Sequence, residues 1–558
     1  MAGRERSNSA SNPLIGAAAA ADKETAVWDG GLRSGSVEEE LLKNRSSVSG
    51  RMSGHRLSTT EFENAPHKSP HEIDPKEAAK HLDPYSAANR AIFASYLAVG
   101  VGLFFTSTPI SFYMVDTLGA TPGQQSVING LSSLPWALKI LCGFLSDSTP
   151  IMGLRRKPYF LIGWGIFIAC NVWLAILKEP SLVMLAALIF LQTMGFVLAD
   201  VCTDAMIVER SQLYEHTGNQ GTLQATGYII RFFGSIVGAT LGAILYNQDS
   251  FGWGVPIWGI FLINASIPLV TVFPCFPTLV EVELEAPPKL KDQIRSIWEL
   301  VQQKAVWKPC CFIYIYNVLL VSNPAWNTFL VAGLGFSNFD LGLLGLAGAV
   351  LSYIALVVYK RYLFDVSWRR VYLFTTAVSL FFSCLQLVLV LQSQQLGSTT
   401  VQLLFAMGSY GMVMFVQAIQ FLPACRMFLG MCPEGAEGSS YAMLTTLSNL
   451  AGTVSYSFAA ALSNIWNVSV PTLQAHNYTG MWKLTLLCGC IQLIGLFFLG
   501  LLPSGVAEQL ANQAASVTSK PAGICFLLVI FGSLSYVITY SLLQILDPSA
   551  VGDDDTSA

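Results

Sequence analysis

Residues 181–203 read SLVMLAALIFLQTMGFVLADVCT, and only Asp200 in this stretch is charged. About 20 apolar residues in a row are enough for a helix to cross the ~30 Å hydrocarbon core of a bilayer. Similar runs recur along the chain, in which 53% of the 558 residues are hydrophobic and 12% are charged. That charged share is about half that of an average soluble domain. The sequence therefore predicts an all-α protein that crosses the lipid bilayer several times.

Twelve such runs form two groups of six. They lie at about 91–114, 124–145, 158–177, 181–203, 223–246 and 255–274, and then at about 309–331, 338–359, 369–392, 399–424, 438–464 and 481–502. Two sets of six helices are the layout of the major facilitator fold. A further apolar run at 522–546 has no place in that plan and predicts either an extra helix or a lid over the bundle.

Seven segments are expected along the chain. They are a disordered cytoplasmic tail (1–88), an N-terminal six-helix bundle (89–274), a cytoplasmic linker (275–308), a C-terminal six-helix bundle (309–503), a second linker (504–521), the extra hydrophobic helix (522–546) and an acidic tail (547–558). The first tail is rich in Ser, Arg, Glu and Gly and lacks apolar periodicity, so it buries too little surface to offset the entropy of ordering.

The distribution of Lys and Arg predicts the orientation in the membrane. Arg155-Arg156-Lys157 follows the second run and five more cations lie in 289–308, whereas the loops after runs one, five, seven, nine and eleven carry none. The positive-inside rule then places the amino terminus in the cytoplasm and residues 465–480 outside. That loop holds two glycosylation sequons, at Asn467 and Asn477. The plasma membrane is the expected location, with a vacuolar or other endomembrane as the alternative.

Several functional classes are excluded by residue usage. Net charge is −4 and no dense Lys/Arg cluster occurs, so nucleic acid is not an expected partner. The six histidines fall outside the apolar runs, and the twelve cysteines show no zinc spacing. We therefore expect no metal, no cofactor and no enzymatic activity. The absence of a Gly-x-x-x-x-Gly-Lys-Ser/Thr string argues against an ATP-driven pump.

The second half of the chain repeats the first. A shift of about 215 residues aligns Pro109 with Pro324 and Arg155 with Arg370. The two prolines interrupt the first and seventh runs at matching places and are candidate helix kinks. Parallel six-helix repeats rock against each other around a central cavity, so the repeat favours a transporter over a receptor or a membrane enzyme.

The loop between the second and third runs reads GFLSDSTPIMGLRRKP at 143–158, and a shortened copy, DVSWRR, lies at 365–370. A carboxylate at a helix end and arginines across a tight turn can pair in one state of a transporter and separate in another. We predict a gating role for both copies, whereas the alternative is a simple positive-inside anchor. The residues concerned are Asp147, Arg155, Arg156, Asp365, Arg369 and Arg370.

The string ADVCTDAMIVER at 199–210, together with Trp136-Ala137-Leu138-Lys139 and the 143–158 loop, resembles the folate–biopterin transporter family. The resemblance covers about 90–503. It implies proton-coupled transport of folates, reduced pterins or antifolates. Two alternatives stay open, namely a major facilitator for another solute, such as S-adenosylmethionine, a nucleoside or an amino-acid derivative, and a solute-sensing transceptor.

Four charged residues, Lys139, Asp200, Asp204 and Arg231, lie inside apolar runs, where an ionised group costs ~2.5–3.5 kcal/mol. They should face the bundle interior and pair with one another. Three roles stay open: a structural or gating network, a site in which Lys139 and Arg231 hold substrate carboxylates, and a proton carrier at Asp200 or Asp204. Weaker candidates for solute contacts are Trp136, Phe232, Phe233, Trp326, Tyr410, Asn323, Gln417 and Gln420.

Overall fold

The computed structural model describes residues 81–546, with gaps at 119–121, 217–218, 247–251, 282–289, 337, 394, 396–397, 434 and 464. This part of the chain is helical apart from loops and two isolated bridges, which confirms the all-α prediction. The acidic tail 547–558 and residues 1–80 of the expected cytoplasmic tail lie outside the described residues.

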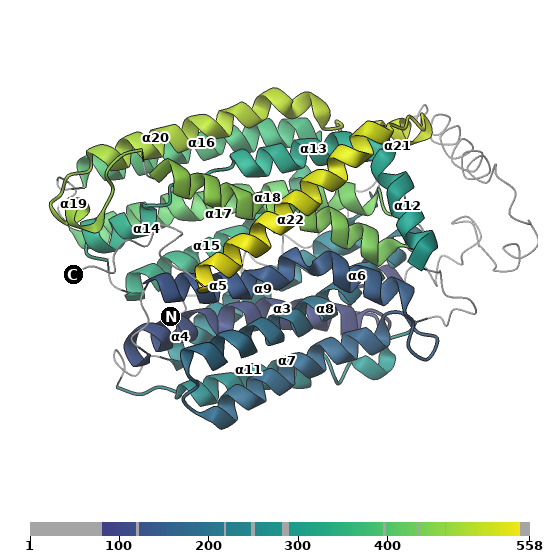
Figure 1. Cartoon of the computed structure of the whole chain (residues 1–558), viewed down its shortest axis with the longest axis horizontal. Coiled ribbons are helices and arrows are strands. Elements are labelled where there is room, and N and C mark those ends of the chain that lie inside the picture. Colours follow the sequence, from purple (N-terminus) through teal and green to yellow (C-terminus); the bar gives the residue numbers. More distant parts are fainter. Residues whose placement is uncertain are drawn as a thin grey trace, which may run out of the picture. The chain divides into compact units, whose positions relative to one another are not determined.

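The helices of the first half lie side by side with their axes roughly aligned (Figure 1). They are α3 (Arg90–Phe105), α4 (Ser107–Phe112), α5 (Pro122–Ala137), α6 (Lys139–Ser148), α7 (Lys157–Leu177), α8 (Leu182–Tyr214), α9 (Thr222–Leu245) and α11 (Ile257–Thr271). Pro109 lies in the short α4, just after the interruption at Thr106, where its missing N–H removes a helix hydrogen bond. A second interruption at Leu138 separates α5 from α6, so that Lys139 is the first residue of α6.

The second half has the same kind of architecture. Its helices are α12 (Leu290–Gln302), α13 (Lys304–Leu319), α14 (Trp326–Thr328), α15 (Asn338–Val358), α16 (Trp368–Gln392), α17 (Thr399–Leu429), α18 (Glu437–Ser463), α19 (Val470–Gln474), α20 (Thr479–Ile494), α21 (Val506–Ala514) and α22 (Lys520–Leu546). Pro324 lies in the break between α13 and α14, the counterpart of the interruption near Pro109. The expected linkers are partly helical, since α12 and α21 lie within them.

Ten helical segments of the described chain are long and apolar enough to cross a membrane. They match ten of the thirteen expected runs. The other three runs are helical as well: the second is divided into α5 and α6, the seventh is broken around Pro324, and the eleventh is the Ser- and Thr-containing α18.

Glycines join α3 to α9 with their backbones in contact. Gly234, Gly238 and Gly242 follow one another at four-residue intervals along α9 and face the α3 backbone. A methyl group on Gly238 would lie 2.4 Å from the Val101 carbonyl oxygen. On the α3 side, a methyl group on Gly100 would lie 1.9 Å from the Arg231 carbonyl oxygen. Small residues allow such close approach in membrane helices. Here they fix the position of Arg231 along α3.

The extra hydrophobic run forms the helix α22, which packs on the bundle. It contacts α5 of the first half, α13 and α18 of the second, and the linker helix α12 (Figure 1). Phe526, Ile530 and Val537 of α22 are buried, and the Tyr314 and Ser533 hydroxyls are 2.7 Å apart. The helix therefore bridges the two halves.

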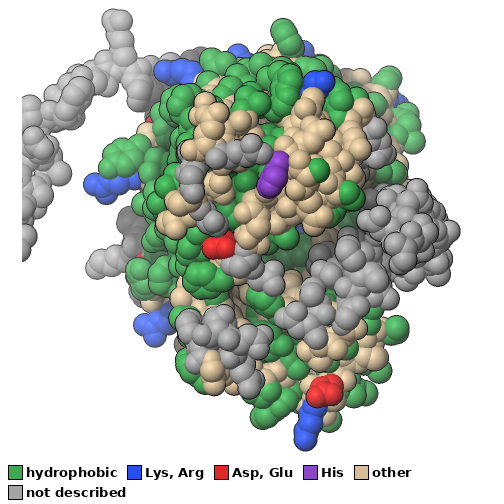
Figure 2. Space-filling model, turned by 90° about the vertical axis from the view of Figure 1, so that its left-hand side faces the viewer, with side chains coloured by type: hydrophobic (Ala, Val, Ile, Leu, Met, Phe, Trp, Pro, Cys, Tyr) green, Lys and Arg blue, Asp and Glu red, His purple; other side chains and the backbone are tan. Residues whose placement is uncertain are grey.

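The two ends of the bundle are marked by different short helices. The linker helices α12 and α21 lie at one end and α19 lies at the other (Figure 1). Figure 2 looks onto the α19 end, where apolar side chains and uncharged polar atoms predominate among the coloured atoms and Lys and Arg are sparse. Asn467 and Asn477, which flank α19, are exposed.

Candidate functional site

The long helix α8 carries buried or half-buried polar side chains at three successive levels. Gln192 lies nearest the start of the helix, Asp200 and Asp204 follow, and Glu209 lies near the end. With a rise of 1.5 Å per residue, the first two levels are about 12 Å apart and the last two about 8 Å apart. Each level belongs to a different group of contacts: a cavity, an ion cluster and a network between the two halves.

The middle level brings together the four charged residues that the sequence singled out, which we call the ion cluster: Lys139, Asp200, Asp204 and Arg231. The Lys139 Nζ atom is 2.8 Å from Asp200 Oδ2 and 2.6 Å from Asp204 Oδ2. The Arg231 Nη1 atom is 3.0 Å from Asp200 Oδ1. Lys139 and both aspartates are buried. Two cations and two anions cancel, which reduces the cost of placing them in an apolar bundle.

Three elements hold the cluster in place. Asp200 and Asp204 are one turn apart on α8 and therefore share a face. Lys139 enters from the break between α5 and α6, and Arg231 enters from α9, whose backbone is fixed against α3 by the glycines.

Neutral side chains link the ion cluster to the second half. The Tyr96 hydroxyl donates to Asp204 Oδ1 at 2.6 Å. The Gln224 Nε2 atom lies 3.4 Å from the same oxygen and 3.2 Å from the Tyr441 hydroxyl on α18. None of these three residues was predicted from the sequence. Gln224 meets the criterion that identified Arg231, since it is a polar residue in an apolar helix.

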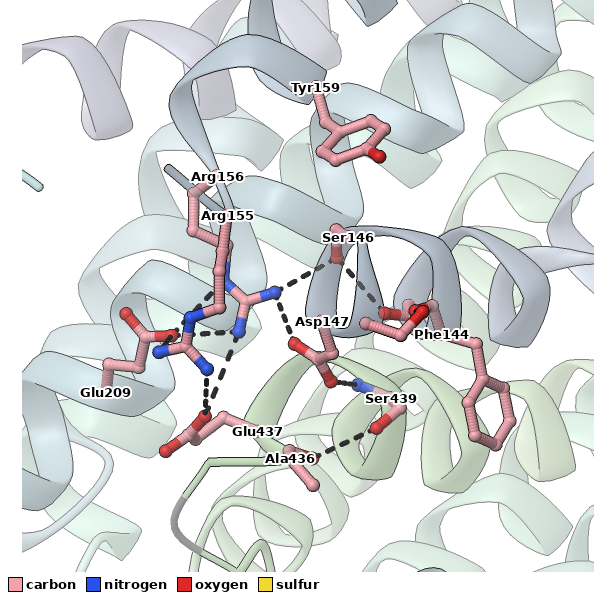
Figure 3. A network of polar contacts seen from close by, with 12 residues as sticks. Phe144, Ser146, Asp147, Arg155, Arg156, Tyr159, Glu209, Ala436, Glu437 and Ser439 are labelled. Carbon is pink, nitrogen blue, oxygen red and sulfur yellow. Dashed lines mark hydrogen bonds and ion pairs between the residues drawn. The ribbon is translucent and has the colours of Figure 1, made fainter. Parts of the chain in front are cut away.

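A polar network, which we call the gate network after the role predicted for its loop, joins the 143–158 loop to α18 of the second half (Figure 3). Asp147 forms an ion pair with Arg156 and accepts a hydrogen bond of 2.6 Å from the Ser439 backbone N–H. Since Ser439 lies in the first turn of α18, the carboxylate also faces the positive end of that helix dipole. Asp147 and Arg156 are fully buried.

Two glutamates complete the gate network. The Arg156 Nη2 atom is 2.8 Å from Glu209 Oε1 on α8, and the Arg155 Nη1 atom is 3.8 Å from Glu437 Oε2 on α18. Neither glutamate was predicted to meet the arginines, because nothing in the linear pattern indicates which loop the arginines contact.

The shortened copy of the loop makes different contacts. Asp365 and Arg370 are exposed, and Arg369 pairs with Glu508 of α21 at 2.8 Å. Burial raises the pKa of Glu508, but hydrogen bonds from Ser504 and the Arg369 charge outweigh it and hold the pKa below its ordinary value. The second half instead reaches the first through Arg426, whose Nε atom donates to the Gln220 carbonyl oxygen at 2.8 Å.

A cavity of about 330 Å³ lies at the first level of α8. Among the residues that line it are three aromatic side chains and Gln192 together with several hydroxyls: Trp136, Phe167, Phe196, Thr193, Ser132, Ser133, Thr106, Ser107 and Ser111. Trp136 also contacts the ion cluster, since its ring centroid is 5.4 Å from the Arg231 guanidinium carbon and 5.8 Å from Lys139 Nζ. The cavity and the ion cluster therefore share one tryptophan.

Several weaker candidates lie elsewhere. Trp326 is buried against Phe329, with ring centroids 5.7 Å apart, and Asn323 donates to the Thr485 hydroxyl at 2.8 Å. Gln420 donates to the Tyr316 and Thr375 hydroxyls inside the second half. Of the eight weaker candidates, Trp136 alone is among the described residues that line this cavity.

Comparison with known proteins decides the family. The BT1 family model matches residues 99–521. The chain belongs to the BT1 family. Its relatives include the folate-biopterin transporter of Synechocystis sp. (strain ATCC 27184 / PCC 6803 / Kazusa), which is 28% identical over 424 residues, or 74% of this chain and 81% of the relative. Folate transporter 1 of Plasmodium falciparum (isolate 3D7) is 23% identical, over 79% and 84% of the two chains. The probable folate-biopterin transporter 2 of Arabidopsis thaliana is 22% identical, over 73% and 80%.

The fold of this BT1-family chain is that of a major facilitator. It matches the proton:xylose symporter XylE with a TM-score of 0.55 and 13% identity, over 79% of this chain and 99% of that one. The predicted family resemblance, the major facilitator fold and the prediction of a transporter rather than an enzyme are thus confirmed.

Proposed function

We propose that this transporter moves folates or pterins across a membrane by alternating access, with protons as the coupled ion. The observation that carries the proposal is the neutral, buried ion cluster of Lys139, Asp200, Asp204 and Arg231, which lies between a cavity and a network joining the two halves. The names of three curated relatives support folates or pterins as the solute.

The position of the gate network supports alternating access. Asp147 and Arg156 meet α18 at the end of the bundle where α6 contacts the linker helix α12, whereas the cavity lies along the first half of α8, at residues 189–196. This arrangement corresponds to a transporter closed on the linker side. For the halves to rock, the Asp147–Ser439 hydrogen bond has to break. This bond therefore contributes to the difference in free energy between the two states.

The ion cluster suggests how protons couple to an anionic solute. Asp200 faces two cations, whereas Asp204 faces Lys139 and two neutral groups, Tyr96 and Gln224. In this proposal Asp204 takes the proton. A protonated Asp204 leaves the cluster with one excess positive charge, which a solute carboxylate can balance. Proton and anion then enter the bundle together at little electrostatic cost.

The test is uptake of labelled folate in a host that lacks folate uptake, with folate, biopterin, methotrexate and S-adenosylmethionine as competitors. Folates and pterins should compete. Competition by S-adenosylmethionine alone would favour the alternative solute, and binding without flux would favour a sensor. Asp204→Asn should lose proton-driven accumulation yet retain exchange of labelled for unlabelled solute, while unchanged accumulation would exclude Asp204 as the carrier.

The proposed location is the plasma membrane, with a vacuolar or other endomembrane as the alternative. Two exposed sequons beside α19 support a membrane of the secretory pathway, where the glycosylation machinery acts on luminal loops.

A further inference from the structure

Three aromatic rings form part of the cavity wall. Trp136, Phe167 and Phe196 all line it, and the rings of Trp136 and Phe196 meet edge to face with centroids 5.8 Å apart. Aromatic rings of this kind favour offset-stacked or edge-to-face contact with another ring. The volume of about 330 Å³ is at the lower end of the range for small-molecule sites. Volume and lining therefore fit a flat ring system.

The hydroxyl groups on the wall present acceptors to a ligand. Ser107 donates to the Phe104 carbonyl at 2.9 Å, and Ser111 donates to the Ser107 carbonyl at 3.0 Å. Thr193 donates in the same way to the Ile189 carbonyl at 2.8 Å. A hydroxyl has one proton, so these oxygens can only accept a further hydrogen bond.

Gln192 adds an amide oxygen, which is a stronger hydrogen-bond acceptor than the hydroxyl oxygens. Gln192 is 6% exposed and lines the cavity, yet its Oε1 atom has no hydrogen-bond partner among the residues that the structure describes. Buried polar atoms without a partner are rare in native proteins and call for an explanation. An N–H group on a ligand in the cavity would supply the missing partner.

We infer that this cavity binds a planar heteroaromatic ring that carries several N–H donors, with Gln192 Oε1 accepting from an amino group and Trp136 stacking on the ring. The aminopyrimidine edge of a pterin has this chemistry. The inference rests on the proposed function and deepens it, because it assigns the ring to this cavity. Lys139 and Arg231, which lie near the Trp136 ring, would then bind the carboxylates of the solute.

The test measures binding to the purified full-length protein in detergent. The probes are biopterin, which has the pterin ring without the glutamate, and p-aminobenzoylglutamate, which has the glutamate without the pterin ring. Gln192→Leu keeps the approximate volume and removes the acceptor, so the Kd for biopterin should rise at least about tenfold. The Kd for p-aminobenzoylglutamate should stay within about twofold.

Two further variants separate binding from folding. Gln192→Glu keeps acceptor oxygens and should retain biopterin binding better than Gln192→Leu. Gln492→Leu, on α20 in the second half, is the matched control and should leave both affinities unchanged. The melting temperature of Gln192→Leu should equal or exceed that of the wild type, because an unpartnered acceptor has been removed.

The outcomes distinguish the inference from the proposed function. Folate binding that is normal in Gln192→Leu would overturn the inference and leave the function intact. An equal loss of both probes, or a lower melting temperature with proportionate loss of binding, would also overturn it. If the wild type binds neither folate nor biopterin, the proposed function itself is wrong.

Discussion

Lys139 is the residue on which the ion cluster depends most. Its ammonium group reaches both aspartates, whereas Arg231 reaches Asp200. Removing Lys139 would leave Asp204 without an ion-pair partner among the described residues. Removing Arg231 would leave both aspartates paired with the same cation, Lys139. Arg231 is therefore the residue at which charge can be removed with the least damage to folding.

Arg231→Ala should lower initial folate uptake at least about tenfold at equal surface expression, because the cluster is left with one excess negative charge and one cation fewer for a solute carboxylate. Arg231→Lys should recover part of the uptake, since an ammonium keeps the charge but loses the planar guanidinium that lies over Trp136. Adding Asp200→Ala to Arg231→Ala should restore expression without restoring uptake. Full uptake by Arg231→Ala would show that the arginine has neither a pairing nor a solute-binding role.

The residues of the ion cluster could be predicted because charge inside an apolar run is visible in the sequence, and membrane burial demands a partner for it. The contacts of Tyr96 and Tyr441 could not be predicted, because tyrosine is common in membrane helices and its hydroxyl leaves no pattern. Gln192 was missed for a related reason. An uncharged amide costs less to bury, and only the shape of the cavity shows that its oxygen is unpartnered.

At the scale of single elements, the end of α6 and the start of α18 act as a pair. Asp147→Asn should slow transport turnover several-fold and leave the folate Kd within about twofold, because the gate biases the two states without contacting the solute. Ser148→Ala is the matched control, since Ser148 donates to the Phe144 carbonyl within the same helix turn. Turnover and Kd are measured on the same reconstituted preparation. A collapse of binding with normal turnover per bound molecule would contradict a gating role for Asp147.

The internal repeat predicted two copies of this gate, and the structure gives them different partners. The first copy meets α18, whereas Arg369 meets Glu508 of α21, a helix outside the repeat. Repetition in sequence thus predicts the helices better than the contacts of their loops, because loop contacts depend on whatever non-repeated segment packs beside them.

The glycine contact between α3 and α9 gives a prediction about stability. Gly238→Ala should lower the stability by about 1–3 kcal/mol, because the new methyl group meets backbone atoms that cannot rotate away. Gly165→Ala on α7, where no atom of the described residues lies within 4 Å of the added methyl group, should be neutral or slightly stabilising. Thermal unfolding of both variants in the same detergent checks this. Equal melting temperatures would mean that the two helices are not in close contact.

At the scale of the whole molecule, the number and length of the helices were the easiest features to predict, since hydropathy and helix length are set by the bilayer. The helical structure of α12 and α21 was missed because their sequences are too polar and short to register as membrane runs. Their apolar faces are recognisable only once α22 and α13 are in place beside them.

The orientation of the whole molecule can be tested by glycosylation. Asn467 and Asn477 should carry glycans, because both are exposed at the α19 end and that end is expected to face the secretory lumen. Glycosidase treatment should increase the mobility of the wild type on a gel and leave an Asn467→Gln/Asn477→Gln double variant unaffected. A mobility change that persists in the double variant would place the glycan, and this loop, elsewhere.

The helix α22 also affects which molecules can approach from the lipid. It contacts both α5 and α18, which contact each other, so it covers the seam between the two halves on that side. The opposite seam is formed by α9 and α15, where Phe233 and Tyr353 meet with centroids 6.0 Å apart. A solute or lipid dissolved in the bilayer thus meets α22 at the seam of α5 and α18, whereas at the other seam it meets the side chains of α9 and α15 directly. Lateral diffusion into the space between the halves is therefore asymmetric, and hydrophobic inhibitors that enter from the membrane should label α9 and α15 in preference to α5.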